Sequence, residues 1–363
     1  MSEPALLKDI FNPARFRQVA EQLRVIHPGF DAAAFVAQGL EGLEGLSLMQ
    51  RLRRMSLCLR AGLPDDFAEA LVILRQLAPR IEHGFVTLVL PDYVALYGLE
   101  HFDESMAALK FFTVFGSAEF AIREFLRREP ERTLAVMHAW ALDETPAVRR
   151  LASEGCRPRL PWSFRLTALV EDPGPVAGIL ERLRHDSDRS VRTSVANHLN
   201  DIAKDHPDWV LNRLEAWPLD DSACAWIARH ALRTLIKQGD RRALTLIGAG
   251  ATAQVALHSF SLQPGELLLG EHLQLNVVLQ STASTAQRLV LDYRLHYVKK
   301  SGGTSGKVFK LKEVTLAAGD TLAIQHRQHL RNLTTRVHYA GRHRVELLVN
   351  GDSLAQGFFQ LAL

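Results

Sequence analysis

The sequence predicts an α-helical solenoid followed by an antiparallel β-sandwich, and three observations support this. Apolar residues recur with a helical period up to about residue 250, and with a period of two from about residue 255. A pattern of 13 residues occurs twice in the helical part. Pro, Gly and Asn interrupt both parts at short intervals. We therefore expect two domains, over residues 1–250 and residues 255–363.

The first part is predicted to be a succession of short helices. Apolar side chains fall at i, i+3 and i+4 in FRQVAEQLRVI (16–26), SLMQRLRRMSLCLR (47–60), FAEALVILRQL (67–77) and FAIREFLRR (120–128). Pro and Gly between these stretches favour helical hairpins over one long coil.

The repeated pattern indicates how these helices are organised. DETPAVRRLASEG at residues 143–155 matches DSDRSVRTSVANH at residues 186–198, an offset of 43 residues. The match pairs Asp143 with Asp186, Val148 with Val191, Arg149 with Arg192 and Ala152 with Val195. Periods near ~40 residues built from paired helices are typical of HEAT repeats. Such stacks present one helix of each pair on a concave surface that suits a long partner.

The second part is predicted to be all β. HLQLNVVL, RLVLDYRLHYV, KVFKLKEVTL and RVELLV alternate apolar with polar residues, and Asn350-Gly351 is a hairpin signal. About seven short strands in so short a segment are typical of a sandwich of the immunoglobulin or fibronectin type. No Cys-Trp-Cys pattern is present, so the likeness to immunoglobulins is one of architecture.

The composition is that of a soluble protein. The chain is 47% hydrophobic and 23% charged, and no apolar run reaches the ~18 residues that cross a bilayer. MSEPALLKDIFNP lacks the basic start and apolar core of a signal peptide. The three cysteines, Cys58, Cys156 and Cys224, form no CxxC pair, which argues against a zinc site or a disulfide framework. We expect a cytoplasmic monomer with no membrane contact.

Positive charge is concentrated in the second part. Residues 1–254 carry 31 basic and 33 acidic side chains, whereas residues 255–363 carry 12 basic and 7 acidic ones. A polyanionic partner would contact the segment KKSGGTSGKVFKLK, of which we single out Lys299, Lys300 and Lys307. Alternatively, this segment is a solvated hairpin that keeps a sheet edge from aggregating.

One acidic residue breaks a rule of helix stability. In ASEGCRPRLPW (152–162), the helix is expected to end with Gly155 in a left-handed cap. Glu154 then lies in the last turn, where the helix dipole is negative and a cation would be favoured. Arg150, one turn earlier, could neutralise it. Without such compensation, a broken local rule indicates function.

The residues after Glu154 form a group of cations with one aromatic ring. Arg157, Arg159 and Trp162 lie between prolines. Either the loop is stiffened with Trp162 in the core, or the arginines contact phosphates while Trp162 offers its face to a base or sugar.

Glu119 obeys the local rules instead. It lies in GSAEFAIREFLRR, with Ser117 as the expected N-cap and Arg123 as the expected partner at i+4. The dipole favours an acid in the first turn of a helix, so periodicity alone makes Glu119 structural.

The helix predicted from residue 190 carries a polar stripe beside its buried one. The stripe comprises Ser194, Asn197, Asp201 and Lys204. In an inner HEAT helix it would face the groove. The alternative is a solvated face with a contact between Asn197 and Asp201.

The histidines show no metal-ligand spacing, and we expect them, His198 included, on the surface or in the groove. HExxH, Walker and GxSxG motifs are absent. We therefore expect no metal and no cofactor.

The stretches SAEFAIREFL, LASEGCRPRLPW and SVRTSVANHLNDIAKDHPD, followed by an all-β tail, resemble the AlkC branch of the AlkC/AlkD HEAT-like-repeat DNA glycosylases, which are bacterial DNA alkylation repair enzymes. The resemblance covers essentially the whole chain. It implies hydrolysis of the N-glycosidic bond of 3-methyladenine, 3-methylcytosine and similar N3-alkylated bases in duplex DNA. It also implies no metal, no lyase lysine and no full flipping of the base, unlike most glycosylases. The substrate would lie in the bacterial nucleoid.

The resemblance makes Glu119 and Glu154 the catalytic acids and Asp201 the third acid of the site. Arg150 and Trp162 would support it beside the lesion. An N3-alkylated base is cationic and already a good leaving group, and breaking its bond builds positive charge on the sugar. A carboxylate can stabilise that charge and orient the attacking water, which gives Glu154 a reason to break the helix rule.

The expected DNA contacts are Arg150, Arg157, Arg159, Trp162, Asn197, His198, Lys204, Lys299, Lys300 and Lys307. The sandwich is expected to act as a DNA clamp. The competing interpretation is a HEAT-repeat scaffold without catalysis, or a lesion-binding protein that does not cut. The acids separate these possibilities, because a scaffold that binds a polyanion needs no carboxylates in its groove.

Overall fold

The computed structural model describes residues 6–333 and 336–363. It divides into two compact units, Met1–Asp205 (unit 1) and His206–Leu363 (unit 2). The last helix ends at Leu246 and the first strand begins at Val255. The boundary between the units therefore comes before the change from helix to strand, and the last four helices belong to the unit that contains the sandwich.

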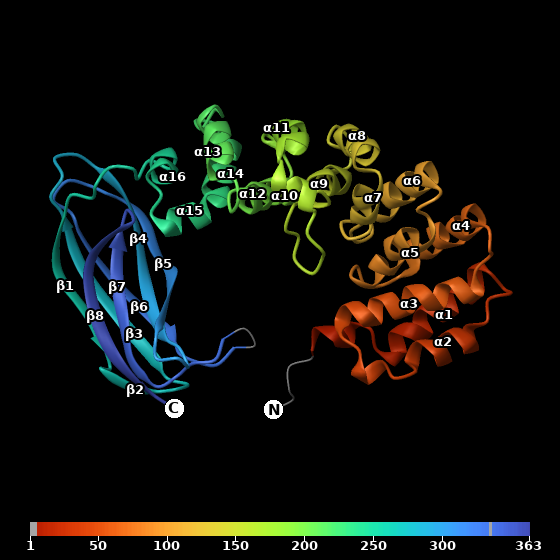
Figure 1. The fold of residues 1–363 in the computed structure, drawn as a ribbon, viewed down its shortest axis with the longest axis horizontal. Coiled ribbons are helices and arrows are strands. Elements are labelled where there is room, and N and C mark those ends of the chain that lie inside the picture. Colours follow the sequence, from red (N-terminus) through yellow and green to blue (C-terminus); the bar gives the residue numbers. More distant parts are fainter. Residues whose placement is uncertain (1–5, 334–335) are drawn as a thin grey trace. The chain divides into compact units, whose positions relative to one another are not determined.

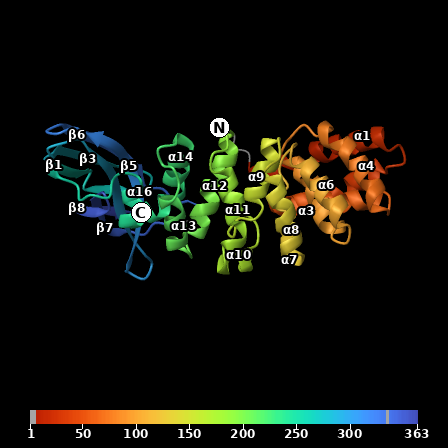
Figure 2. The ribbon, with the colours of Figure 1, turned by 90° about the horizontal axis from the view of Figure 1, so that it is seen from above.

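Unit 1 consists of short helices that succeed one another in chain order (Figures 1 and 2). They are α1 (Pro13–Ile26), α2 (Ala32–Leu40), α3 (Leu48–Gly62), α4 (Phe67–Leu77), α5 (Val89–Tyr97), α6 (Phe102–Phe112), α7 (Ile122–Arg128), α8 (Pro130–Trp140), α9 (Pro146–Glu154), α10 (Thr167–Glu171), α11 (Ala177–Leu183) and α12 (Arg189–Ile202). Single 3-10 turns lie at Leu7–Ile10, Leu43–Gly45, Ala78–Arg80, Val86–Leu88 and Gly174–Val176.

Local signals start many of these helices. Side chains of Asn12, Asp66 and Asp188 accept hydrogen bonds from the first free N–H groups of α1, α4 and α12. Pro130 and Pro146 occupy first positions, where a missing N–H costs nothing. The helices predicted from apolar periodicity are all present, which confirms the helical prediction for this part.

The repeat is visible in individual hydrogen bonds. Its two copies form α9 and α12, which pack against each other. Arg149 donates to the carbonyls six and five residues before it, at 2.9 and 2.8 Å. Arg192 does the same at 2.6 and 2.8 Å. The paired arginines therefore hold the same turn in both copies, as repeats of one supersecondary unit should.

Unit 2 contains the remaining helices and the sandwich. The helices are α13 (Pro207–Glu215), α14 (Ser222–Ala231), α15 (Arg233–Gln238) and α16 (Arg241–Leu246). The strands are β1 (Val255–Gln263), β2 (Glu266–Leu268), β3 (His272–Ser281), β4 (Gln287–Val298), β5 (Thr304–Leu316), β6 (Thr321–His329), β7 (Gly341–Val349) and β8 (Asp352–Ala362). They form a sheet in the order β1-β3-β6 and a second in the order β2-β8-β7-β4-β5.

The sandwich confirms the predicted architecture with two differences. The described residues form eight strands where about seven were expected, and β2 pairs with β8 in parallel. β2 has three residues, too few for an alternating pattern to reveal. The other strand pairs are antiparallel.

Alternation places the core between the sheets. Every second residue of β3 from Leu273 to Leu279 is buried, whereas β4 is buried without a break from Leu289 to Tyr293. Asn350 (φ 48°) and Gly351 (φ 85°) make the predicted turn between β7 and β8. Among the described residues, no helix combines the length and apolarity needed to span a membrane.

Candidate active site

Unit 1 contains a cleft of about 670 Å³ between the segments before α7 and after α9. Its charged lining consists of Glu119, Arg150, Glu154 and Arg157. Its apolar lining includes Phe85, Leu88, Val114, Phe120, Leu160 and Trp162. Carboxylates beside apolar and aromatic surface make this cleft the candidate site.

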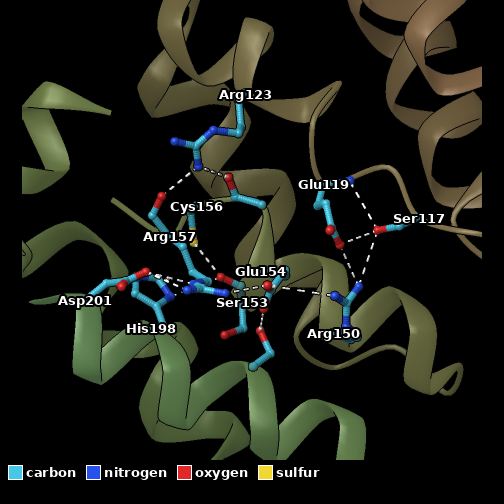
Figure 3. A network of polar contacts seen from close by, with 12 residues as sticks. Ser117, Glu119, Arg123, Arg150, Ser153, Glu154, Cys156, Arg157, His198 and Asp201 are labelled. Atoms are coloured by element: carbon cyan, nitrogen blue, oxygen red, sulfur yellow. Dashed lines mark hydrogen bonds and ion pairs between the residues drawn. The ribbon is translucent and has the colours of Figure 1, made fainter. Parts of the chain in front are cut away.

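Arg150 links two of the predicted acids (Figure 3). It donates to Glu119 Oε2 at 2.7 Å and lies 3.8 Å from Glu154 Oε1. Glu119 also accepts a hydrogen bond from the Ser117 hydroxyl. The expectation that Arg123 pairs with Glu119 is wrong. So is the expected cap, because α7 begins only at Ile122, after Ala121.

Glu154 is paired on both of its oxygens, whereas the sequence offered Arg150 alone as a partner. Arg157 donates to Oε1 at 2.6 Å, and the Ser194 hydroxyl donates to Oε2 at 2.6 Å. The residue is 5% exposed. The expectation of an uncompensated acid is therefore wrong, because the turn after α9 brings Arg157 back to the carboxylate and α12 adds the Ser194 hydroxyl. A buried carboxylate held this way is a fixed negative charge at the cleft.

Gly155 does not adopt the expected left-handed conformation. Its φ of −64° and ψ of −33° continue the helical turn. A Cβ at this position would lie 2.5 Å from Ile122 Cγ2, so close packing against α7 is what requires glycine. Arg123 donates to the Gly155 carbonyl at 3.0 Å. The cation that the negative end of α9 favours thus comes from another helix.

Arg157 connects Glu154 to the third acid. Its Nε and Nη2 donate to Asp201 Oδ2 at 2.9 and 2.8 Å, and Lys204 lies 2.9 Å from Oδ1. Burial lowers the pKa of Arg157, but the charges of Glu154 and Asp201 outweigh it, and the net pKa is raised. The guanidinium is buried and committed to two carboxylates. The expectation that it leaves Glu154 unpaired in order to hold phosphate is therefore wrong.

Asp201 is 3% exposed and is not among the residues that line the cleft. It therefore reaches the cleft only through the Arg157 guanidinium. Tertiary contacts thus bury Asp201, which was expected to face a groove, whereas Ser194 bonds to Glu154 and lines a second hollow with Asn197.

His198 was expected on the surface or in the groove, and this is wrong. It is fully buried, with Nδ1 3.0 Å from the Ser153 carbonyl. Burial, together with the positive charge of Arg157, lowers the pKa of His198 to about 3. The ring is therefore neutral at physiological pH and holds α12 against α9.

The other predicted contacts of unit 1 lie nearer the surface. Asn197 lines a second hollow of about 460 Å³, which also includes Arg150 and Glu154. Arg159 forms a two-pronged pair with Asp205, at 2.9 and 2.7 Å. Asn197 thus lies beside Glu154 at the surface, whereas His198 lies beneath it in the interior.

Trp162 projects into solvent at the edge of the cleft. It is 62% exposed, and its φ of 65° is rare for a bulky residue. The edge of the ring meets Phe85, with centroids 6.2 Å apart. The alternative of Trp162 in the core is thus wrong. A strained, exposed aromatic ring is a feature of binding sites.

The lysines singled out in the sandwich lie on the β4–β5 hairpin, with Lys299 and Lys300 between the strands and Lys307 in β5. Lys299, Lys300 and Lys307 are exposed there. The Lys307 ammonium lies 5.2 Å from the centre of the Phe309 ring.

Sequence reasoning missed the role of Arg123, which is fully buried and ties α7 to the segment after α9. One signal could have revealed it. Within α7, helical spacing puts Arg123 one turn before the apolar Leu126, although Arg127 lies on the same side. An arginine at such a position needs buried acceptors.

Helical repeats with a cleft lined by paired carboxylates and arginines, followed by an immunoglobulin-like sandwich, define the class of protein. Comparisons with known proteins identify the class. Residues 106–235 match the family described as "DNA alkylation repair enzyme". Residues 256–363 match the family described as "Uncharacterised protein YhaZ, C-terminal Ig-like domain".

Two relatives extend over nearly the whole chain. The structure of Pseudomonas fluorescens alkylpurine DNA glycosylase AlkC, bound to DNA containing an abasic site analog, is 53% identical with a TM-score of 0.97. The match covers 99% of this chain and 100% of that one. The protein YhaZ of Bacillus subtilis is 39% identical over 95% of this chain and 96% of its own. The chain belongs to the AlkC branch of the HEAT-like-repeat DNA alkylation repair enzymes.

Proposed function

We propose that this chain is a DNA glycosylase that hydrolyses the N-glycosidic bond of N3-alkylated bases in duplex DNA, 3-methyladenine and 3-methylcytosine among them. The observation that carries the proposal is the pair of carboxylates, Glu119 and Glu154, in one cleft and held by one arginine, Arg150. Membership of the family supports the reaction class.

The chemistry requires negative charge more than acid catalysis. An N3-alkylated base carries a positive charge and leaves without protonation, so the developing charge lies on the sugar. Fixed carboxylates stabilise an oxocarbenium-like transition state because their orientation is set before the reaction. The pairing of both Glu154 oxygens supplies this orientation.

The three acids differ in what their oxygens can still accept. Glu154 has both oxygens engaged, which suits a fixed charge beside the sugar. Among the described residues, hydrogen bonds to Glu119 reach Oε2 alone, so Oε1 can orient the attacking water. Asp201 acts through Arg157, because it does not line the cleft. We assign orientation of the attacking water to Glu119 and stabilisation of the positive charge on the sugar to Glu154. Asp201 positions the Arg157 guanidinium.

The residues around the acids supply the contacts to duplex DNA. Trp162 offers its exposed ring to the lesion or its neighbour, and a base need not enter a closed pocket to meet it. Arg150, Asn197, Arg159 and Lys204 are the proposed contacts to the flanking backbone within unit 1. To bind phosphate, Arg159 would release Asp205 and Lys204 would release Asp201.

The sandwich is proposed to act as a clamp on the DNA backbone. Its excess of five positive charges, 12 basic against 7 acidic side chains, contrasts with the slightly acidic remainder. Lys299, Lys300 and Lys307 lie on a single exposed hairpin, where they can follow a phosphate chain.

Release of free methylated base from alkylated duplex DNA, without added metal, tests the proposal. We expect 3-methyladenine and 3-methylcytosine in the soluble fraction, with abasic DNA left behind. Glu124→Gln is a matched control, because it removes a carboxylate on α7 outside the cleft. Tight binding of alkylated DNA with no base released would mean a lesion-binding protein, and equal binding of undamaged DNA would mean a scaffold.

A further inference from the structure

Arg123 is a large charged side chain that is fully buried near the cleft but does not line it. It lies in α7 with 0% exposure. The ion pairs of the described residues do not include it, although burying an unpaired charge is costly. Burial lowers the pKa of Arg123 to about 10, so the guanidinium remains protonated at neutral pH.

Backbone carbonyls take the place of a carboxylate. Nη1 of Arg123 donates to the carbonyls of Gly155 at 3.0 Å and Arg157 at 2.6 Å, and Nη2 donates to that of Phe164. The guanidinium also lies 5.3 Å from the centre of the Phe164 ring. One side chain thus fixes both ends of the segment 155–164, which carries Arg157 and Trp162. Figure 3 shows Arg123 beside Arg157.

The position of Arg123 in the chain links this segment to the acids. Glu119 lies four residues before Arg123, and Glu154 immediately precedes Gly155. The bond from Arg123 to Gly155 therefore joins the two stretches of backbone that carry these acids. The bond to the Arg157 carbonyl holds the residue whose guanidinium reaches Glu154 and Asp201.

We propose that Arg123 is a positioning residue for base excision: its three bonds set the separation of Glu119 from Glu154 and the direction of the Arg157 guanidinium. The inference rests on the proposed function. Arg123 does not line the cleft, so it acts through the geometry of the acids and of the segment 155–164, and does not itself contact DNA. Misplacement of reacting groups by ~1 Å can cost ~10²-fold in rate.

Arg123→Lys keeps the charge but offers one ammonium in place of a fork that reaches three carbonyls. We expect single-turnover excision with enzyme in excess to fall by ~10- to 10²-fold, and the affinity for alkylated DNA to fall far less. In Arg123→Ala, millimolar guanidinium chloride, well below denaturing concentrations, should restore part of the rate, and sodium chloride should not. The matched control is Arg127→Ala, which removes an exposed arginine over the same Phe164 ring.

Two results would overturn the proposal. One is wild-type excision by Arg123→Lys at saturating enzyme. The other is a loss that appears only in DNA affinity, with full rate once bound. Thermal melting of each variant separates either result from unfolding.

A readout without activity keeps the proposal independent of the reaction. With 5-fluorotryptophan incorporated, the Trp162 resonance, assigned from Trp162→Phe, should shift in Arg123→Lys and stay in place in Arg127→Ala. If the wild type releases no base, the proposed function fails, and this resonance alone decides whether Arg123 positions the segment. An unmoved resonance in Arg123→Lys means that it does not.

Discussion

The first copy of the repeat, residues 143–155, ends with Glu154 and Gly155, whereas the second copy, residues 186–198, has Asn197 at the position that matches Glu154. Arg149 and Arg192 match as well, and they make the same bonds to the turn before each helix. Residues that build the repeat are thus kept in both copies, while the residue that faces the cleft changes from an acid to an amide.

The ends of the two helices differ in the same way. Gly155 lets α9 pack closely against α7, so the chain turns back and places Arg157 over Glu154. The matching residue of the second copy is His198, and α12 continues past it to Asp201. The comparison teaches that one scaffold presents acids in two ways, at the end of a short helix and within the last turn of a longer one.

The largest effect on the excision rate should follow from neutralising Glu154, the residue of the first copy that lines the cleft. Glu154→Gln is expected to lower single-turnover excision by ~10²- to 10³-fold, because a fixed charge at the transition state is removed. Glu119→Gln should fall in the same range. Asn197→Ala, at the matching position of the second copy, should change the rate far less. A rate loss in Asn197→Ala as large as that in Glu154→Gln would break the comparison.

The paired arginines should affect stability instead of rate. Arg149→Ala leaves the Asp186 carboxylate, 5% exposed, without the guanidinium that lies 2.9 Å from its Oδ1. Breaking such a pair should lower the free energy of unfolding by ~3 kcal/mol. Arg192→Ala removes bonds to carbonyls only and should cost ~1 kcal/mol. Urea titration followed by circular dichroism measures both, and equal costs would contradict the distinction.

His198, which follows Asn197 in the second copy, should make the stability of the protein depend on pH. His198 has a pKa of about 3 when folded, against ~6.5 for a free histidine. Between these values the unfolded chain binds the proton more readily, so stability is lost as pH falls below ~6.5.

From pH 7 to pH 5, this loss amounts to ~2 kcal/mol of unfolding free energy. His198→Gln should show a correspondingly flatter dependence, whatever its stability at pH 7. Identical slopes in the two proteins would show that the histidine does not titrate in this way.

The smallest expected effect concerns DNA affinity. Arg149 and Arg192, the arginines that match between the two copies, are committed to protein acceptors, and the net positive charge lies in the sandwich, so we expect much of the attraction for phosphate to come from there. Replacing Lys299, Lys300 and Lys307 by Ala should reduce the slope of log affinity against log salt by ~0.9 for each phosphate that these lysines neutralise. Lys8→Ala, in unit 1, is the control. An unchanged slope in the triple variant would rule out the hairpin as a site of backbone binding.

The sequence by itself determined the order and type of the elements. Helical and two-residue periods, capping residues and the Asn350-Gly351 turn are local properties, so they can be read from neighbours in the chain. The repeat at an offset of 43 residues also predicted that α9 and α12 are equivalent. Glu154 could be recognised as unusual for the same reason, because the rule that it breaks concerns its own helix.

Only the tertiary structure decided which groups meet. The partners of Glu154 come from positions three and 40 residues away, and the cation at the end of α9 comes from position 123. Periodicity identifies a face of a helix but not what packs on it. It therefore predicted that His198 and Asp201 face a groove, whereas packing buries both. Burial then fixes charge, since a carboxylate or guanidinium removed from water must find its partner within the fold.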